Sequence, residues 1–477
     1  MASRGSVRPL TFLRNSFRRA TWSGSGGTPR RPPIPGTLRG EHTPNDKPDE
    51  NERIRFSGGQ LFFEYLIVVS LKKKKKDSEE YEPQITYQFP KREQLIRSQK
   101  EEEETLLKAI PLFCFPDGNN WAPLTEYNSE TFSFVLTNID GSRRFGYCRR
   151  LLPHGSGARL PEVYCIISCL GCFAMFEKIL DEVEKRRQKS TALIYPFMQG
   201  LREAQFPAPG KSVQVKSFIP EHGTEIIELT RPLDSRLEHV DFRPLLKHLS
   251  EEKIIKVFAS ALLERRIIFL AEELSILSQC IHAVAALLYP FTWQHTYIPV
   301  LPEVMIETVC SPTPFMVGVQ KIFEERFQDL PMEEVLIIDL CKGKFTADMS
   351  DEGSIIPPKL QDEMLEMLKN WNKKSESLEE VNNIVTEAFI CFFVRTVGHY
   401  TQYLKRNGAQ MAQFQEKPFR KSLSSRSIRR CLKKFMTTQM FSVFVEEAEK
   451  RPVAQKGYFE QKVIEYREMK KKDKDKS

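Results

Sequence analysis

The chain of 477 residues is long enough for two or more domains, each with a core of its own. Its composition, with 40% hydrophobic and 28% charged residues, is that of an ordinary globular protein rather than a disordered or fibrous one. No apolar run approaches the roughly 18 residues that a membrane-spanning helix needs. The most apolar helical segment, 381–397, contains Glu387 and Arg395, so we do not expect an integral membrane protein.

The net charge of +8 is concentrated at the N-terminus. Residues 1–40 contain eight arginines and no lysine or acidic residue, and the rest of the chain has 63 basic and 63 acidic residues. A nucleic-acid-binding protein normally carries its basic excess on a folded face, so this distribution argues against nucleic acid as a partner. The ten cysteines are irregularly spaced, mostly within apolar runs, and no secretory signal precedes them. This pattern predicts reduced core thiols and a cytoplasmic protein.

Both ends of the chain have the composition of disordered tails. Residues 1–52 are rich in Arg, Ser, Gly and Pro, and residues 466–477 contain six basic and three acidic residues. Two alternatives remain open for the N-terminal tail. Segment 1–22 has the Arg-rich, acid-free composition of a mitochondrial presequence. Segment 29–35 has the proline pattern of a polyproline II ligand for an SH3-type groove.

Five consecutive lysines, Lys72 to Lys76, form a second local concentration of positive charge. Acidic residues follow directly at Asp77, Glu79 and Glu80, which is typical of a solvated loop between strands. A patch for an anionic membrane or for nuclear import is the alternative. Peripheral membrane contact is therefore a hypothesis for this loop and for the basic tail.

A first domain over residues 55–205 is predicted to combine strands, a hairpin and helices. Asp-Gly at 140–141 lies between two alternating runs, which is a hairpin signal. The predicted elements are a long apolar strand at 60–71, hairpin strands at 131–137 and 142–149, a strand at 162–168, and helices at 172–187 and 191–205. Residues 206–224 contain Pro, Gly and Lys, which indicates a connection to the next domain.

The central region, residues 222–357, is predicted to build an α/β core. Ser250 is placed to cap a helix whose apolar side chains recur at every fourth residue. The next predicted elements are a strand at 267–271, a helix at 274–288, an extended segment at 296–301 and a buried strand at 335–340. Strand, helix and strand form a βαβ unit, and Pro299 indicates an edge position or a bulge.

The closing segment, residues 359–450, is predicted to be helical. One apolar stripe is formed by Leu360, Met364, Met367, Leu368 and Trp371. Ser377 and Glu380 have the spacing of a capping box at the start of a long helix. Residues 424–450 indicate one or two further helices.

The motifs in the sequence do not assemble a catalytic or cofactor site. Cys165, Cys169 and Cys172 have the spacing of an iron–sulfur site, but the first two would lie about 13 Å apart on a strand. Gly-Lys-Ser at 210–212 lacks the upstream glycine of a phosphate-binding loop. We expect core thiols, no metal or cofactor, and a protein that binds rather than performs covalent chemistry. A metalloenzyme using the cysteine triplet is the alternative, and it predicts visible-range absorbance.

Several segments resemble the modules of the DENN family. The stretch 262–302, which begins LLERRIIFLAEELSILSQ, and CSPTPFMVGV at 310–319 resemble the central module. TFSFVLTNIDGSRRFGYCRRLLP at 131–153 and LPEVYCIISCLGCF at 160–173 resemble the upstream module, and PLDSRLEHVD at 232–241 leads into the central one. The helical end resembles the downstream module.

The resemblance covers roughly residues 55–450 and is greatest to subfamily 2 of the DENN family. It is similar to the short members of that subfamily, because the long N-terminal region of the larger ones is absent from this sequence. The resemblance implies a longin-like N-lobe of strands, hairpin and helices, followed by an α/β C-lobe and a closing helical segment. The upstream, central and downstream modules would then occupy residues 55–205, 222–357 and 359–450.

Members of this family are guanine-nucleotide exchange factors for Rab GTPases, so the resemblance implies a Rab partner held between two lobes. Subfamily 2 implies Rabs of late-endosome traffic and a cytoplasmic protein that is peripheral on endosomal membranes. Exchange factors act by binding the nucleotide-free GTPase, and a 10⁴-fold faster release requires about 5.5 kcal/mol of differential binding. A non-catalytic adaptor that binds a GTPase or trafficking protein through the same cleft is the alternative.

Six residues in the segments that carry the resemblance are candidates for GTPase contact. They are Asn138, Asp140, Arg143, Arg265, His295 and Tyr297. Two of them have plainer interpretations: Arg265 as an ion-paired part of the scaffold, and His295 as a hydrogen-bonded structural histidine. We expect nearby Trp293 to belong to the core.

Overall fold

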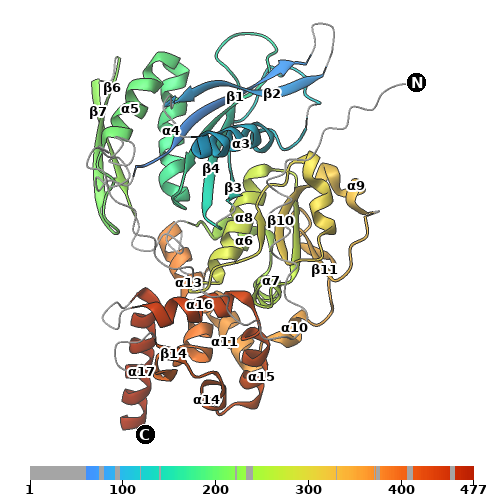
Figure 1. Cartoon of the computed structure of the whole chain (residues 1–477), viewed down its shortest axis with the longest axis vertical. Helices are drawn as coiled ribbons and strands as arrows, with labels where there is room; N and C mark the ends of the chain where they lie inside the picture. The colour runs from blue at the N-terminus through green and yellow to red at the C-terminus, as the bar shows by residue number, and fades with distance from the viewer. Residues whose placement is uncertain are drawn as a thin grey trace, which may run out of the picture.

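The computed structural model describes residues 61–476 except 75–79, 92–96, 119, 139–140, 221–222, 232–239, 329, 370, 372–376, 406–411 and 452–456. Figure 1 shows three parts stacked along the longest axis: a strand-rich N-lobe, an α/β C-lobe and a helical end. The predicted N-terminal tail, the two last lysines of the Lys72 to Lys76 run and Asp140 lie outside the described residues.

The N-lobe is built on a five-stranded antiparallel sheet in the order β2-β1-β5-β4-β3. Its strands are β1 (Tyr65–Lys73), β2 (Tyr81–Phe89), β3 (Glu130–Thr137), β4 (Arg143–Leu151) and β5 (Glu162–Ser168). The predicted strands and the hairpin are confirmed, and Thr137 pairs with Arg143 at its closed end. Strand β2 was not predicted, because its polar sequence YEPQITYQF includes a proline and lacks an apolar run.

Helices cover both faces of this sheet, which explains why β1 is apolar at nearly every position. Helices α4 (Phe173–Lys189) and α5 (Ile194–Glu203) bury the face that includes Leu66 and Ile166. The opposite face, with Ile67 and Cys165, packs in one continuous core with α3 (Arg97–Cys114) and the C-lobe. Helices α4 and α5 were predicted. Helix α3 was not.

The predicted connection at 206–224 is wrong, because most of it forms a second small sheet of the N-lobe. Strands β6 (Ser212–Ile219) and β7 (Gly223–Thr230) pair antiparallel, and Figure 1 shows them beside α5. Alternate side chains, including Val215, Ile227 and Leu229, are buried in the α4–α5 core. The Pro, Gly and Lys residues at its start concealed this period-two pattern, so the N-lobe extends to Thr230.

The C-lobe contains a second five-stranded sheet in the order β12-β11-β8-β10-β9. Its elements are α6 (Arg243–His248), α7 (Glu251–Leu262), β8 (Arg266–Ala271), α8 (Leu274–Leu287), β9 (Thr296–Ile298), β10 (Phe315–Gln320), α9 (Glu324–Gln328), β11 (Val335–Asp339) and β12 (Lys344–Ala347). The predicted βαβ unit is confirmed, with β10 inserted between β8 and β9. Strand β9 lies at an edge, as Pro299 indicated. Ser250 occupies the N-cap position of α7, but its side chain makes no capping hydrogen bond.

The helical end is organised around one long apolar helix, α13. It includes α10 (Glu352–Ile355), α11 (Pro358–Leu368), α13 (Leu378–Thr396), α14 (Glu416–Lys421), α15 (Arg426–Phe435), α16 (Gln439–Lys450), α17 (Tyr458–Lys476) and the short strands β13 (Leu404–Lys405) and β14 (Gln413–Phe414). The Ser377 hydroxyl accepts a hydrogen bond from the Glu380 amide at 3.3 Å, which confirms that part of the predicted cap.

Helix α13 is long and apolar enough to cross a membrane, yet 61% of its most apolar window is buried inside the protein. Three of its rings, from Phe389, Phe392 and Phe393, surround Phe258 of α7 at centroid distances of 4.8–5.7 Å. Such packing is that of a core helix. The helix therefore holds the helical end against the C-lobe.

The predicted disorder of residues 466–477 is wrong, because helix α17 continues to Lys476. Its first half is attached to the helical end by the buried side chains of Phe459 and Val463. The Glu460 carboxylate also accepts a 2.6 Å hydrogen bond from Tyr400. A helix nucleated by such packing extends into a polar sequence at little further cost, since each added residue gains one backbone hydrogen bond.

The two lobes meet where edge strand β3 lies along helix α8, as Figure 1 shows. The Ser133 hydroxyl of β3 lies 2.9 Å from Nε2 of His282 on α8, and the Tyr297 hydroxyl of β9 lies 2.6 Å from Nδ1. The ring of Phe173 packs on the imidazole with centroids 4.0 Å apart. We call Ser133, Arg143, His282 and Tyr297 the lobe joint.

Burial keeps the lobe joint electrically neutral except for one guanidinium. Desolvation, and then the charge of Arg143, lower the pKa of His282 to about 3. Burial raises the pKa of Tyr297. The imidazole is therefore neutral at physiological pH, so one ring nitrogen donates a hydrogen bond and the other accepts one.

Acidification is expected to destabilise the protein through His282. The unfolded chain takes up a proton at this residue near pH 6.5, whereas the folded chain does so only near pH 3. Because the folded pKa is the lower one, the stabilisation is complete above pH 6.5 and is lost as the pH falls toward 3. Between pH 7.5 and 5.5 the free energy of unfolding should fall by about 1.4 kcal/mol from this residue alone.

Urea unfolding of the wild type and of His282→Gln at both pH values measures this contribution, because the other titrating groups are common to both proteins. The wild type should lose about 1.4 kcal/mol more than the variant over that interval. Equal losses in the two proteins would contradict a neutral, buried imidazole.

Candidate functional site

The predicted contact residues that the structure describes lie at two internal joints and at the closed end of the β3–β4 hairpin. Arg143 and Tyr297 belong to the lobe joint between N-lobe and C-lobe. Arg265 and His295 lie where the C-lobe meets the helical end. Asn138 lies at the hairpin end, and the structure does not describe Asp140.

Arg143 and Tyr297 face each other across the lobe joint. The Arg143 guanidinium donates a hydrogen bond to the Trp293 carbonyl and lies 5.1 Å from the centre of the Tyr297 ring. Burial lowers the pKa of Arg143. Tyr297 is only 5% exposed in this structure, and its contact with a GTPase stays a prediction. Trp293, at 2% exposure, is a core residue as predicted.

Arg265 is part of an ion-paired scaffold, which was the plainer of its two interpretations. Its guanidinium lies 2.6 Å from Asp351 and 3.4 Å from Glu352, the residues that begin α10. The hydrogen bond and charge of Arg265 lower the pKa of Asp351 despite its partial desolvation. The side chain of Arg265 is 11% exposed and its charge is neutralised within the chain.

His295 joins a second intramolecular contact, centred on Glu264. The His295 Nε2 atom lies 2.9 Å from one Glu264 carboxylate oxygen. That carboxylate also accepts hydrogen bonds from the backbone amides of Gln439 and Met440, at 2.9 and 2.7 Å, in the first turn of α16. An acidic group is favourable at a helix N-terminus. This contact ties the C-lobe to the helical end and leaves His295 mainly structural.

Asn138 is fixed at the hairpin end by a network that sequence reasoning did not find. Its amide donates to the Ser142 hydroxyl at 2.9 Å, and its side-chain oxygen accepts from Arg144 at 2.9 Å. Arg144 also pairs with Glu64 at 3.1 Å and Glu102 at 2.9 Å. Arg144 lies on β4, Glu64 directly precedes β1 and Glu102 lies on α3, so no local motif could have indicated the whole network.

A polar surface lies directly outside the lobe joint. The N-lobe contributes Asn138 and exposed Ser142, which precedes Arg143 in the chain. The C-lobe contributes exposed Thr292 and half-buried Gln294, which flank Trp293. The hydrogen bond from Arg143 to the Trp293 carbonyl links the two chain segments that carry these four residues. We call them the joint rim, and they form a surface that both lobes position.

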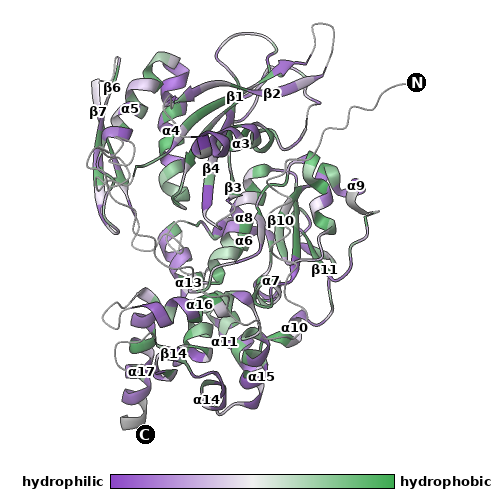
Figure 2. Ribbon diagram, viewed as in Figure 1, coloured by the Kyte–Doolittle hydropathy of each residue, from purple (hydrophilic) through white to green (hydrophobic). Residues whose placement is uncertain are grey.

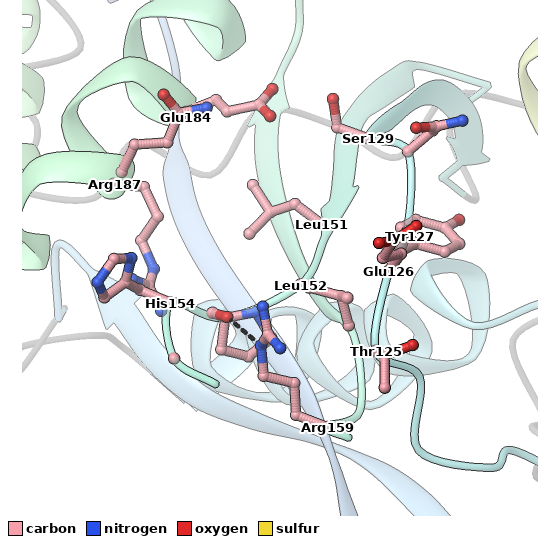
Figure 3. A pocket seen from close by; sticks show the side chains of 14 residues that line it. Thr125, Glu126, Tyr127, Ser129, Leu151, Leu152, His154, Arg159, Glu184 and Arg187 are labelled. Atoms are coloured by element: carbon pink, nitrogen blue, oxygen red, sulfur yellow. Dashed lines mark hydrogen bonds between the residues drawn. The ribbon is translucent and has the colours of Figure 1, made fainter. Parts of the chain in front are cut away.

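A pocket of about 420 Å³ lies in the N-lobe, between the end of β4 and α4. Figure 3 shows Glu184 and Arg187 on one side and Glu126 and Tyr127 on the other. Its strongest charges are already engaged: Arg187 with Glu162, Glu184 with Arg149, and Arg159 with the Pro153 carbonyl. The pocket therefore lacks the converging, uncommitted charges of a polar ligand site.

The cysteine triplet does not converge. Cys169 is exposed, whereas Cys165 lies in the sheet core, where its sulfur is within 4.8 Å of those of Cys114 and Cys148. All three of these clustered thiols are fully buried. Burial raises the pKa of Cys148 and of Cys165, whereas for Cys114 desolvation is outweighed by the hydrogen bonds from those two thiols, which lower its pKa to about 6. Of the predicted core thiols in the triplet, Cys165 and Cys172 are buried as expected, whereas the prediction is wrong for Cys169, which is exposed.

Three family models match this chain in sequence order. The uDENN domain matches residues 83–151, the DENN (AEX-3) domain matches residues 159–343, and the dDENN domain matches residues 414–462.

Curated relatives match over most of the chain. DENN domain-containing protein 2D of Homo sapiens is 63% identical over 429 residues, covering 90% of this chain and 91% of the relative. The protein of the same name from Mus musculus is 59% identical over 474 residues, covering 99% of each. DENN domain-containing protein 2B of Homo sapiens is 52% identical over 437 residues, covering 90% of this chain but 38% of the relative. With three DENN models matched in order and such relatives aligned over nearly its full length, the chain belongs to the DENN domain family.

Proposed function

We propose that this protein is a guanine-nucleotide exchange factor that accelerates GDP release from a Rab GTPase. The observation that carries the proposal is membership of the DENN family, which is known for Rab exchange factors, with a match along nearly the whole chain. Such a factor binds the nucleotide-free GTPase more tightly than the nucleotide-bound form. Each tenfold acceleration of release takes about 1.4 kcal/mol of differential binding.

The joint rim is our candidate for the surface that contacts the GTPase. Both lobes contribute to it, and the buried hydrogen bond between Ser133 and His282, at 2.9 Å, holds the lobes together at the adjoining lobe joint. Binding to a surface that is already ordered avoids an entropic cost of ordering loops. A rim composed of Asn138, Ser142, Thr292 and Gln294 also offers hydrogen-bonding groups without a fixed charge.

The cellular setting is a further part of the proposal. The subfamily suggests Rabs of late-endosome traffic and a cytoplasmic protein that acts at endosomal membranes. Peripheral contact could come from the Arg-rich N-terminal tail or from the Lys72 to Lys76 run. In that run, Lys72, Lys73 and Lys74 are exposed, and Lys74 pairs with Glu80 at 3.2 Å.

Release of a fluorescent GDP analogue from a panel of purified Rabs tests the proposed activity. The full chain should accelerate release from one or two of them, by roughly 10²–10⁴-fold, because only a matched interface supplies the differential binding. Binding to a Rab without acceleration, and with equal affinity for its nucleotide states, would favour the adaptor. Absence of binding to every Rab would contradict the exchange activity and an adaptor function toward a Rab.

Thr292→Arg tests the joint rim with the responsive Rab. A large cation at the centre of the contact should lower exchange efficiency at least tenfold, or by about 1.4 kcal/mol in transition-state stabilisation. Thr224→Arg on β7 is the matched control, because it makes the same change at another exposed threonine. Both variants should keep the unfolding midpoint of the wild type. Full activity of Thr292→Arg would place the contact elsewhere on the molecule.

A further inference from the structure

The segment 416–434 carries a local concentration of positive charge that the sequence analysis did not single out. It contains eight basic residues and a single acidic one, Glu416. Basic and acidic residues balance across the chain once the N-terminal 40 residues are set aside, so this excess is a local asymmetry of the folded part. We call its basic residues the α14–α15 basic surface: Lys417, Arg420, Lys421, Arg426, Arg429, Arg430, Lys433 and Lys434.

Most of these side chains are exposed, and none of the eight forms an ion pair within the described part of the chain. Six are exposed, while Arg420 and Arg429 are half-buried. Arg429 donates to the backbone carbonyl of Leu423 at 2.8 Å. The arginines of the N-lobe behave differently, since Arg149, Arg150 and Arg187 each pair with a carboxylate at 2.9 Å or less. The described part of the chain therefore concentrates uncompensated positive charge on this surface.

The basic side chains lie on the outer sides of two helices that are packed into the core of the helical end. Helix α15 buries Cys431, Leu432 and Phe435 on one side, and its basic residues occupy the other side. Helix α14 is anchored by Phe419, which is fully buried against the rings of Phe414 and His399. Figure 2 shows the polar character of both helices at the end of the molecule furthest from the N-lobe.

We propose that the α14–α15 basic surface docks the protein on an anionic lipid membrane. A membrane is a plane of exchangeable negative headgroups, so it binds separate lysine and arginine side chains without a fixed geometry. Single-stranded nucleic acid would require exposed aromatic rings for base stacking. The phenylalanine rings of helices α14 and α15, from Phe419 and Phe435, are buried. The inference does not depend on exchange activity and places the membrane contact away from the joint rim.

The expected strength follows from the number of charges. Each lysine or arginine held near an anionic surface strengthens binding by about fivefold, so removing three should weaken it by on the order of 100-fold. The interaction should also weaken as added salt shortens the Debye length from about 10 Å toward 3 Å.

Vesicle co-sedimentation of the full chain tests the proposal. The vesicles contain about 70% phosphatidylcholine, 25% phosphatidylserine and 5% phosphoinositide, and vesicles of phosphatidylcholine alone serve as the reference. The wild type should bind the anionic vesicles only. The triple variant Arg426→Gln, Arg430→Gln and Lys433→Gln should bind them about 100-fold more weakly. All three positions are exposed, so its unfolding midpoint should match the wild type.

A charge-matched control separates this surface from net charge and from the basic tail. Lys211→Gln, Lys216→Gln and Lys344→Gln remove three exposed lysines from β6, the loop before it, and β12. This variant should bind vesicles as the wild type does. Equal binding by both triple variants, or no binding by the wild type, would overturn the proposal. Retention of a single-stranded RNA probe without vesicle binding would overturn it in favour of nucleic acid.

The same triple variant should retain its exchange rate on a Rab in solution. Loss of vesicle binding with unchanged exchange would separate membrane docking from the proposed activity. Failure of exchange in the wild type would leave the vesicle result unaffected, so the two proposals can fail independently.

Discussion

The packing of edge strand β3 along helix α8 is the contact on which the arrangement of this molecule depends. It joins two sheets that have separate strand orders, β2-β1-β5-β4-β3 and β12-β11-β8-β10-β9. One face of the N-lobe sheet shares a continuous core with the C-lobe through this contact. The joint rim exists only because β3 and α8 hold that register. The binding of a partner to the joint rim therefore depends on the relative position of the two lobes.

The chemistry of the joint favours one orientation over others. The hydrogen bond between Ser133 and His282, and the one from Arg143 to the Trp293 carbonyl, cross the lobe boundary, so these groups would lose a partner if the lobes slid or separated. An unpaired buried polar group costs about 1–3 kcal/mol. Apolar packing alone would tolerate small displacements of one lobe along the other. Buried hydrogen bonds make such displacements unfavourable, because each one leaves a polar group without its partner. The same logic applies at the other joint, where Glu264 binds both His295 and the start of α16.

Sequence patterns predicted what is local in this fold. The Asp-Gly hairpin, the βαβ unit and the Ser377 cap depend on residues close together in the chain, and the structure confirms them. The β6–β7 sheet and α17 were mistaken for a linker and a disordered tail, because their order comes from packing rather than propensity. Of the candidate contacts, Tyr297 and Arg265 contact Arg143 and Asp351, which are distant in the chain and which no sequence pattern indicated. Ser133 and His282 are 149 residues apart, so no spacing rule connects them.

The position of β5 in the N-lobe sheet determines where the polypeptide of a DENN protein can be cut without disrupting the sheet. The DENN match begins at residue 159, yet β5 (Glu162–Ser168) lies between β1 and β4 in the N-lobe sheet. A cut between the uDENN and DENN matches would therefore remove an interior strand and expose two unpaired edges. The matched segments are units of sequence description and not of autonomous folding. Gene rearrangement or truncation at that border would yield fragments prone to aggregate, so the two segments are expected to be inherited together.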